Sequence, residues 1–312
     1  MFGTGLLEQE LGLAALAVIL LALALYIGVS NRRRPSVAVE WFILGLVGMR
    51  MVQLVMIVQV PELYLRVEAA LAFFPFSYYL YFGSPLGALS WLSYLWTPFT
   101  YALLHADGIH LFTNGVGIFI FGRVVAWRLG AGGFFWLFAL SSASGALFHL
   151  VLEFATATPM IGASAGAMGL MGATFRFVPG TKDRLKSLFW PDETIRQAPV
   201  YDTSRLLKER RGWSYVLLCF LIFPVGLIAY FLGTAGQVAV MAHLGGVLFG
   251  YFGFKRLDRR CLDLHSLNHV PVVTSKKKEG LAMKFLRGLA IFMFGAGLLM
   301  GVFGYYLQAL QQ

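Results

Sequence analysis

The chain has 312 residues, of which 58% are hydrophobic and only 13% charged, and its mean hydropathy is +0.72. This composition excludes a water-soluble globular protein and predicts a polytopic membrane protein made of helices. The formal net charge is +10. Because the basic residues cluster between apolar segments, we interpret this charge as a topology signal, with nucleic-acid binding a poor second reading.

Apolar runs of about 20 residues have the length that crosses a hydrocarbon core as a helix. The first of them is expected to be retained, because residues 1–10 lack the basic start of a signal peptide. Cys219 lies in an apolar run and Cys261 in a basic segment, so we expect neither a disulfide nor a metal site. The predicted spans are 10–29, 38–60, 101–122, 133–152, 161–178, 213–232, 237–254 and 285–307.

Charge placement orients these spans. All but Arg50 and Arg66 of the 25 Lys and Arg fall in four segments that the alternation of spans places on one side. The positive-inside rule makes this side cytoplasmic, so both ends of the chain and the long, aromatic-rich connection 61–97 are expected outside. Arg50 falls near the middle of a span, where a charge is costly, and we interpret it as a shifted helix boundary or a snorkelling side chain.

The cytoplasmic connection 179–212 carries apolar residues among basic ones. This pattern fits an interfacial helix on anionic lipid, a docking site or simply a solvated loop.

Polar residues that carry chemistry occur inside three of the spans. Ser164 and His243 lie a few residues into spans that both enter from outside, which places both about 7 to 9 Å below the outer boundary. The first turns of the third span carry His105, His110 and Asn114. His110 and Asn114 are four residues apart and therefore share a helix face. We expect these polar groups to converge at one level.

These residue types together suit acyl transfer. A serine hydroxyl becomes a useful nucleophile when a neighbouring imidazole takes its proton, a role that His243 can fill for Ser164. Attack on a carbonyl creates an oxyanion that needs prearranged donors. The Asn114 amide, a His110 ring N–H and the Ser164 backbone N–H are candidates, and a position near the start of a helix adds a favourable dipole.

Glycines flank both residues. Gly162 and Gly166 form a small-xxx-small pair around Ser164, and Ala242, Gly246 and Gly250 form a stripe of small residues at four-residue spacing next to His243. Such stripes let helix backbones approach closely in lipid. They are equally common as plain packing glycines in membrane bundles.

Three motifs together resemble the rhomboid intramembrane serine proteases, over roughly residues 38–256. They are His105-Ala-Asp-Gly-Ile-His110-Leu-Phe-Thr-Asn114, Gly162-Ala-Ser164-Ala-Gly166 and Ala242-His243-Leu-Gly-Gly-Val-Leu-Phe-Gly250. The resemblance implies an all-α membrane helical bundle with a six-helix core. This chain would add one extra helix within 1–37, next to a basic turn, and another within 257–312.

The resemblance also implies an activity, namely cleavage of transmembrane proteins near the outer membrane face. Ser164 would be the nucleophile and His243 the general base, in a dyad without an acidic third member. His110 and Asn114 would support the oxyanion with Gly162 beside them, and His105 would help to hold water. The resemblance implies no cofactor and no metal, transmembrane protein substrates and membrane lipid as partners, and a multi-pass protein of the cell membrane, of bacterial inner-membrane type.

Three positions depart from the family's commonest pattern. Ala165 follows the serine where the family has Gly, which would add a methyl near the oxyanion site. Met168 stands where the family often has an aromatic ring that packs on the histidine, and a thioether can fill such a gap flexibly. Trp96-Thr97 replaces a Trp-Arg pair of the first outer loop, so the arginine's anchoring role is in doubt.

Three other classes of function remain as alternatives. Residues 162–166 formally match the G-x-S-x-G nucleophile elbow of α/β-hydrolases, which requires a strand-turn-helix setting. An inactive rhomboid-like protein that binds membrane clients would usually lack the serine or the histidine. A transporter or channel would use the small and polar residues as a pore lining, but it gives no reason for Ser164 and His243 to share one depth.

Overall fold

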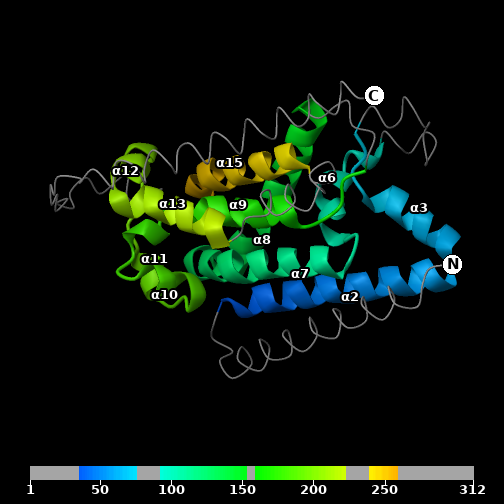
Figure 1. Cartoon of the computed structure of the whole chain (residues 1–312), viewed down its shortest axis with the longest axis horizontal. Helices are drawn as coiled ribbons and strands as arrows, with labels where there is room; N and C mark the ends of the chain where they lie inside the picture. The colour runs from blue at the N-terminus through cyan, green and yellow to red at the C-terminus, as the bar shows by residue number, and fades with distance from the viewer. Residues whose placement is uncertain (1–34, 76–91, 153–158, 223–238, 259–312) are drawn as a thin grey trace.

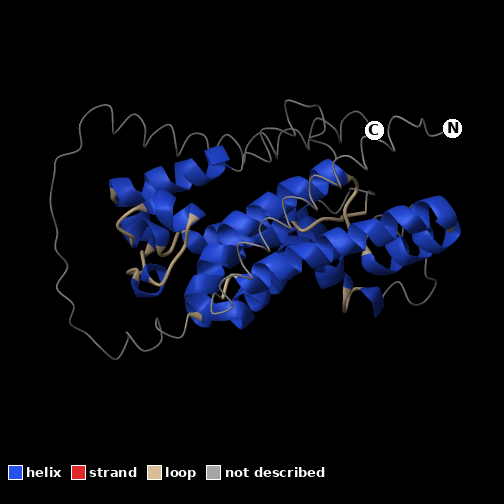
Figure 2. Cartoon of the chain, turned by 90° about the horizontal axis from the view of Figure 1, so that it is seen from below, coloured by secondary structure: helices blue, strands red, loops and turns tan. Residues whose placement is uncertain are grey.

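The computed structural model describes residues 35–75, 92–152, 159–222 and 239–258. Within these ranges the chain consists of helices and connecting loops, with no strand longer than an isolated antiparallel bridge between Phe73 and Met160. Figure 2 shows the same helical composition from below. The predicted all-α bundle is therefore confirmed. The expected extra helices, at 10–29 and 285–307, lie outside the described residues.

Helix α2 (Val37–Gln59) matches the predicted span 38–60. Helix α3 (Pro61–Leu71) follows after a single residue and begins with proline, which is suited to the first position of a helix. Part of the connection 61–97 is therefore helical. In the described part of the chain, α2 and the stretch Gly108–Leu152 are the two helical segments long and apolar enough to cross a membrane.

The third predicted span begins later than expected. The short helix α6 (Thr97–Thr100) and the 3-10 turn η1 (Tyr101–Leu103) are followed by a loop, and helix α7 (Gly108–Gly117) starts only after it. The reason is the cap residue Asp107, whose carboxylate accepts a hydrogen bond from the His110 backbone N–H at 2.6 Å. The prediction that His105 lies in the first turn of the helix is therefore wrong, because His105 lies in the loop.

The next two spans form a helical hairpin. Helix α7 continues through the π-helical turn η2 (Ile118–Gly122) into α8 (Arg123–Leu152). Inside α8, Gly130 has φ +77°, which glycine adopts without steric cost, and the helix breaks there. This break separates the predicted spans 101–122 and 133–152.

Helices α9 (Ser164–Thr174) and α15 (Val240–Leu257) carry the two candidate catalytic residues. Apart from Ser164, every residue of α9 is buried, and the helix packs between α8 and α15 (Figure 1). It begins at Ser164, three residues after the start of the predicted span 161–178. Helix α13 (Arg210–Ile222) covers the described part of the predicted span 213–232.

The glycines of α9 and α15 are in backbone-to-backbone contact. A Cβ added at Gly250 would overlap the carbonyl group of Gly169, and one added at Gly172 would overlap the backbone of Val247. No flexible side chain is available to move aside at either place. The small-residue stripes therefore set the spacing between the helix that carries Ser164 and the helix that carries His243.

This close approach predicts a clear difference between two glycine substitutions. Gly250→Ala would force α9 and α15 apart and should cost about 1 to 3 kcal/mol of stability. Gly48→Ala, on α2 with nothing within 4 Å of its added Cβ, should cost none. Thermal unfolding of both variants in one detergent measures the difference. Equal midpoints would contradict the proposed packing role.

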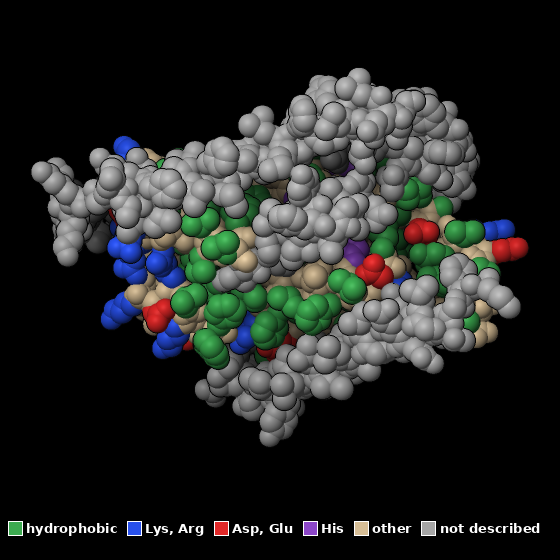
Figure 3. Space-filling model, viewed as in Figure 1, with side chains coloured by type: hydrophobic (Ala, Val, Ile, Leu, Met, Phe, Trp, Pro, Cys, Tyr) green, Lys and Arg blue, Asp and Glu red, His purple; other side chains and the backbone are tan. Residues whose placement is uncertain are grey.

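Residues 178–209, between α9 and α13, form a compact unit of short helices. They comprise the 3-10 turn η3 (Val178–Gly180), α10 (Arg184–Phe189), α11 (Thr194–Gln197) and α12 (Thr203–Lys208). Leu188, Ile195 and Leu206 are buried in the main core. The reading of 179–212 as a solvated loop is therefore wrong. Lys and Arg side chains gather at this end of the molecule (Figure 3).

One buried arginine ties this unit to the bundle. From α8, Arg128 donates through Nε and Nη2 to Oδ2 of Asp258, just past α15, at 2.9 and 2.8 Å. Its Nη1 donates to the carbonyl oxygens of Ile195, Arg196 and Ala198 at 3.1, 2.9 and 2.8 Å. Arg128 thus joins α8, the end of α15 and the α11 segment.

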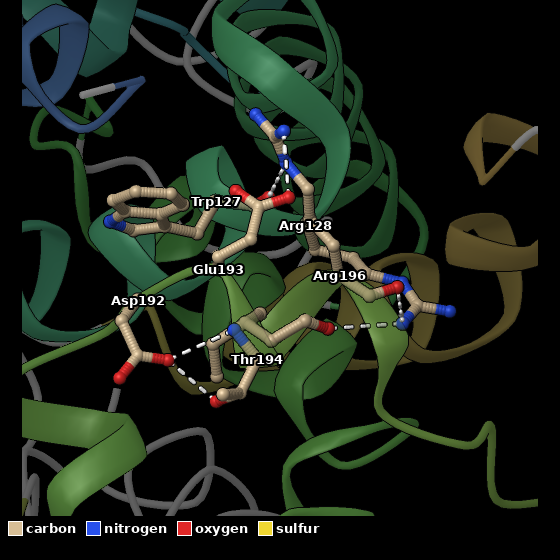
Figure 4. A network of polar contacts seen from close by, with 7 residues as sticks. Trp127, Arg128, Asp192, Glu193, Thr194 and Arg196 are labelled. Carbon is tan, nitrogen blue, oxygen red and sulfur yellow. Dashed lines mark hydrogen bonds and ion pairs between the residues drawn. The ribbon is translucent and has the colours of Figure 1, made fainter. Parts of the chain in front are cut away.

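A second polar group stabilises the start of α11. The Thr194 hydroxyl and backbone N–H both donate to Oδ1 of Asp192, at 2.5 and 2.9 Å (Figure 4). The hydroxyl bond, helped by the backbone bond and by Lys186, lowers the pKa of the Asp192 carboxyl. This carboxylate is therefore ionised at neutral pH, the form that accepts both hydrogen bonds.

Candidate active site

The Ser164 hydroxyl and the His243 imidazole are in direct contact. The distance between Ser164 Oγ and His243 Nε2 is 2.7 Å, although the residues are 79 positions apart in the sequence. Ser164 is the first residue of α9, and His243 lies in the first turn of α15. His243 is almost fully buried, whereas Ser164 keeps partial exposure. The pair has the geometry of a nucleophile and its base.

The loop before Ser164 is fixed by backbone hydrogen bonds on two sides. Met160 and Phe73 exchange N–H···O bonds of 2.8 and 3.1 Å, and the Gly162 N–H donates to the Tyr101 carbonyl at 3.0 Å. Gly162 has φ +114°, in the region that favours glycine. The chain therefore enters α9 abruptly, which leaves the first backbone N–H groups and the positive end of the helix dipole beside the serine.

His110 and Asn114 face this same loop. A Cβ added at Gly162 would lie 2.5 Å from both Cε1 and Nε2 of His110 and 3.5 Å from Nδ2 of Asn114. Asn114 is buried, and its Nδ2 donates to no described residue. Only glycine leaves room at position 162 for these two polar side chains. Of the five polar residues expected to converge, Ser164, His243, His110 and Asn114 thus lie around this loop.

His105 stands apart from this group. It is fully buried in the loop before α7, where its ring packs edge-on against His110 with 5.3 Å between ring centroids. No described hydrogen bond brings it to Ser164 or His243. Its contact with the site is therefore indirect, through the His110 ring.

The two departures on α9 have structural explanations. Ala165 is buried in a cluster with Tyr101, Ala146 and Ala242, and a Cβ added at Gly145 would lie 2.5 Å from the Ala165 methyl. That methyl thus fills the space over Gly145 between helices. Met168 is buried in the main core.

The third departure concerns the segment before α6. Without an arginine at position 97, Trp96 still anchors this segment, since its Nε1 donates to the Ala70 carbonyl of α3 at 2.7 Å. The Thr97 hydroxyl turns back to the Ser93 carbonyl at 2.9 Å. The start of α6 is therefore tied to α3 without an arginine at position 97.

Sequence reasoning did not find the inward contacts made by two polar residues of α2. Arg50 and Gln53 are both buried, and both donate to the carbonyl oxygen of His105, at 3.2 and 3.4 Å. The interpretation of Arg50 as a shifted boundary or a snorkelling side chain is wrong, because α2 runs unbroken through it and its guanidinium points inward. Its place mid-span was a usable signal, since charges at membrane depth usually face the bundle interior.

Chemically, the site offers a nucleophile with a base and nearby donors. His243 can take the proton of Ser164, whose hydroxyl is the hydrogen-bond partner of its Nε2. The positive helix end, Asn114 and His110 surround the loop where an oxyanion would form. The G-x-S-x-G elbow reading is wrong, since Ser164 follows a loop inside a helical bundle and not a strand.

Fold and site together define a helical bundle with large apolar faces exposed and a serine–histidine pair between two of its helices. The Rhomboid domain family matches residues 92–254, which is more than half of the chain. The chain belongs to the rhomboid family, whose members are embedded in membranes. The comparison with curated proteins and that with solved structures gave no match.

Proposed function

We propose that this protein is an intramembrane serine endopeptidase that hydrolyses a peptide bond in transmembrane proteins near the outer membrane face. The observation that carries the proposal is the 2.7 Å contact between Ser164 Oγ and His243 Nε2, formed between two helices inside an apolar bundle. A transporter or a client-binding protein has no chemical need for this pairing. A protease has one, because serine is a weak nucleophile without a base.

Acylation would proceed as follows. Oγ of Ser164 attacks the scissile carbonyl carbon while its proton passes to Nε2 of His243. The carbonyl oxygen becomes an oxyanion, stabilised by the Asn114 amide, a His110 ring N–H and the Ser164 backbone N–H. As the tetrahedral intermediate collapses, His243 gives the proton to the leaving amine and the C–N bond breaks. An ester between Ser164 and the amino-terminal product segment remains.

Deacylation uses the same groups with water as the nucleophile. His243 takes a proton from the water molecule as its oxygen attacks the ester carbonyl, and then returns the proton to Ser164 Oγ. The products are a free carboxylate and a regenerated hydroxyl. No metal or organic cofactor takes part in this scheme. The partners of the protein would be transmembrane protein substrates and the surrounding membrane lipid.

For its cellular location, we propose a multi-pass protein of the cell membrane, of bacterial inner-membrane type. Side chains exposed on the bundle surface include Trp41, Val55, Leu147 and Phe252, which hydrocarbon would solvate better than water. The Lys and Arg residues that gather over α10 to α12 (Figure 3) support a cytoplasmic position for this end under the positive-inside rule. Residues 38–256 would form the protease core, flanked by one further span on each side.

The class of function can be tested by covalent labelling. A serine-directed fluorophosphonate should label the wild-type protein in detergent but not Ser164→Ala. The same preparations should be incubated with a transmembrane test substrate, and cleavage should follow the labelling. A wild-type protein that neither labels nor cleaves would favour the client-binding or transport alternatives.

Asn114 provides a test of the oxyanion site. Replacing it by Ala removes one donor and should lower kcat by about tenfold or more, because donors of this kind contribute about 3 to 4 kcal/mol to other transition states. The unfolding midpoint should stay close to that of the wild type, since the amide donates to no described residue. An unchanged kcat would remove Asn114 from the site.

A further inference from the structure

Arg50 and Gln53 are two buried polar residues in the second half of the strongly apolar helix α2. Helix α2 includes an 18-residue window with mean hydropathy 2.0. Although Arg50 and Gln53 are polar, they are only 4% and 2% exposed. A charged group at this depth is costly unless protein groups surround it. The position of α2, residues 37–59, also lies before the matched range 92–254. Its polar residues therefore need an explanation of their own.

Both side chains bind the backbone of one residue, His105. Gln53 Nε2 donates to the His105 carbonyl at 3.4 Å, and Gln53 Oε1 accepts from the His105 N–H at 3.2 Å. Arg50 Nη1 donates to the same carbonyl at 3.2 Å. An amide side chain has an acceptor oxygen and a donor NH₂ group. It can therefore pair with the N–H and the C=O of one residue, as a neighbouring β-strand would. The N–H and the C=O of His105 are both held by α2.

This peptide belongs to the loop that sets the start of α7. Two residues further on, Asp107 caps the helix through the His110 N–H. The Ala106 N–H points at Nδ1 of His110, with 3.5 Å between the nitrogens. The His105 ring packs on the His110 ring. A shift of the His105 peptide would therefore move His110 and, one turn along the same helix face, Asn114.

From these contacts we infer that Arg50 and Gln53 are positioning residues for the oxyanion site: they hold the His105 peptide and, through the α7 cap, fix His110 and Asn114 relative to Ser164. This inference rests on the proposed function for its catalytic part. Its geometric part, that α2 clamps the loop before α7, stands independently. The clamp links a helix without any reacting group to the donors that face Gly162.

The catalytic part can be tested by a double-mutant cycle. Gln53→Leu removes both hydrogen bonds to the His105 peptide and should lower kcat about tenfold, with KM within about twofold of the wild type. In the Asn114→Ala background the same change should lower kcat much less than tenfold, because the donor it positions is already gone. A fully multiplicative loss would overturn the inference.

Conservative and matched variants separate positioning from folding. Arg50→Lys keeps a charged donor and should retain more kcat than Arg50→Met. Val55→Leu, at a site on α2 that is 61% exposed, should leave kcat unchanged. Equal activity of the Lys and Met variants, at equal unfolding midpoints, would overturn the role assigned to Arg50.

Hydrogen exchange tests the geometric part without any need for activity. Backbone amides of residues 104–110 should exchange faster in Gln53→Leu than in the wild type or in Val55→Leu. Unchanged exchange would overturn the clamp. A wild-type protein that neither labels with fluorophosphonate nor cleaves would instead refute the proposed function, and with it the catalytic part of this inference, whatever the exchange result.

Discussion

Replacing Ser164 or His243 by Ala should reduce kcat by about 10⁴-fold or more. The reason is that the two side chains act as one unit: without the hydroxyl no ester forms, and without the imidazole at 2.7 Å nothing takes its proton. Losses of about this size are known when one member of such a unit is removed, and removing the second member adds little. Cleavage of a transmembrane substrate by single and double variants measures both effects.

The matched control for this result is a serine on a neighbouring helix. Ser142 on α8 is fully buried, and its hydroxyl turns back to the Phe138 carbonyl of its own helix at 3.0 Å. Ser142→Ala should therefore keep most of the wild-type activity. Cleavage by Ser164→Ala at the rate of Ser142→Ala would reject the proposed nucleophile.

The largest effect on stability is expected at Arg128. Arg128→Met removes a guanidinium that is bound to Asp258 and to three carbonyl oxygens in a buried setting. Breaking a buried ion pair by removing one partner typically costs about 3 to 5 kcal/mol, because the other charge stays buried after its ion pair is lost. Unfolding in detergent measures this loss. Removing both charges, as in Arg128→Met with Asp258→Leu, should recover part of it.

An exposed ion pair of the same segment serves as the comparison. Nζ of Lys186 and Oδ2 of Asp192 are 3.9 Å apart, with side chains 65% and 46% exposed. Such pairs contribute about 0 to 1 kcal/mol, so Lys186→Met should unfold close to the wild type. If Arg128→Met did the same, the α11 segment would not depend on Arg128 for its attachment to the bundle.

Both expectations concern the two ends of α15. Its first turn carries His243, whereas Asp258 follows its last residue and is held by Arg128. Between these ends, Gly246 and Gly250 bring its backbone against α9, next to the carbonyls of Ala165 and Gly169. The helix that carries the proposed base is thus fixed by a polar clamp at one end and by backbone contact along its length.

The helical membrane class and the site residues could be predicted from the sequence because both depend on local properties. In lipid, a single apolar segment can satisfy all of its own backbone hydrogen-bonding groups only as a helix. Ser164 and His243 stand out because polar reactive groups are rare in such runs, and the small residues beside them indicate close helix packing. The family match over 92–254 agrees with the predicted helical membrane class.

Only the tertiary structure decided how the loops and the buried charges are used. Asp107 caps α7 and so ends the loop that contains His105, and the positive φ of Gly162 lets α9 begin at Ser164. Each helix start thus depends on a single residue, which the hydropathy of an apolar run does not reveal. The partners of Arg50 and Arg128 lie 55 or more positions away in the sequence. A charge in an apolar run shows that it needs a partner, but only packing of distant segments determines which one it finds.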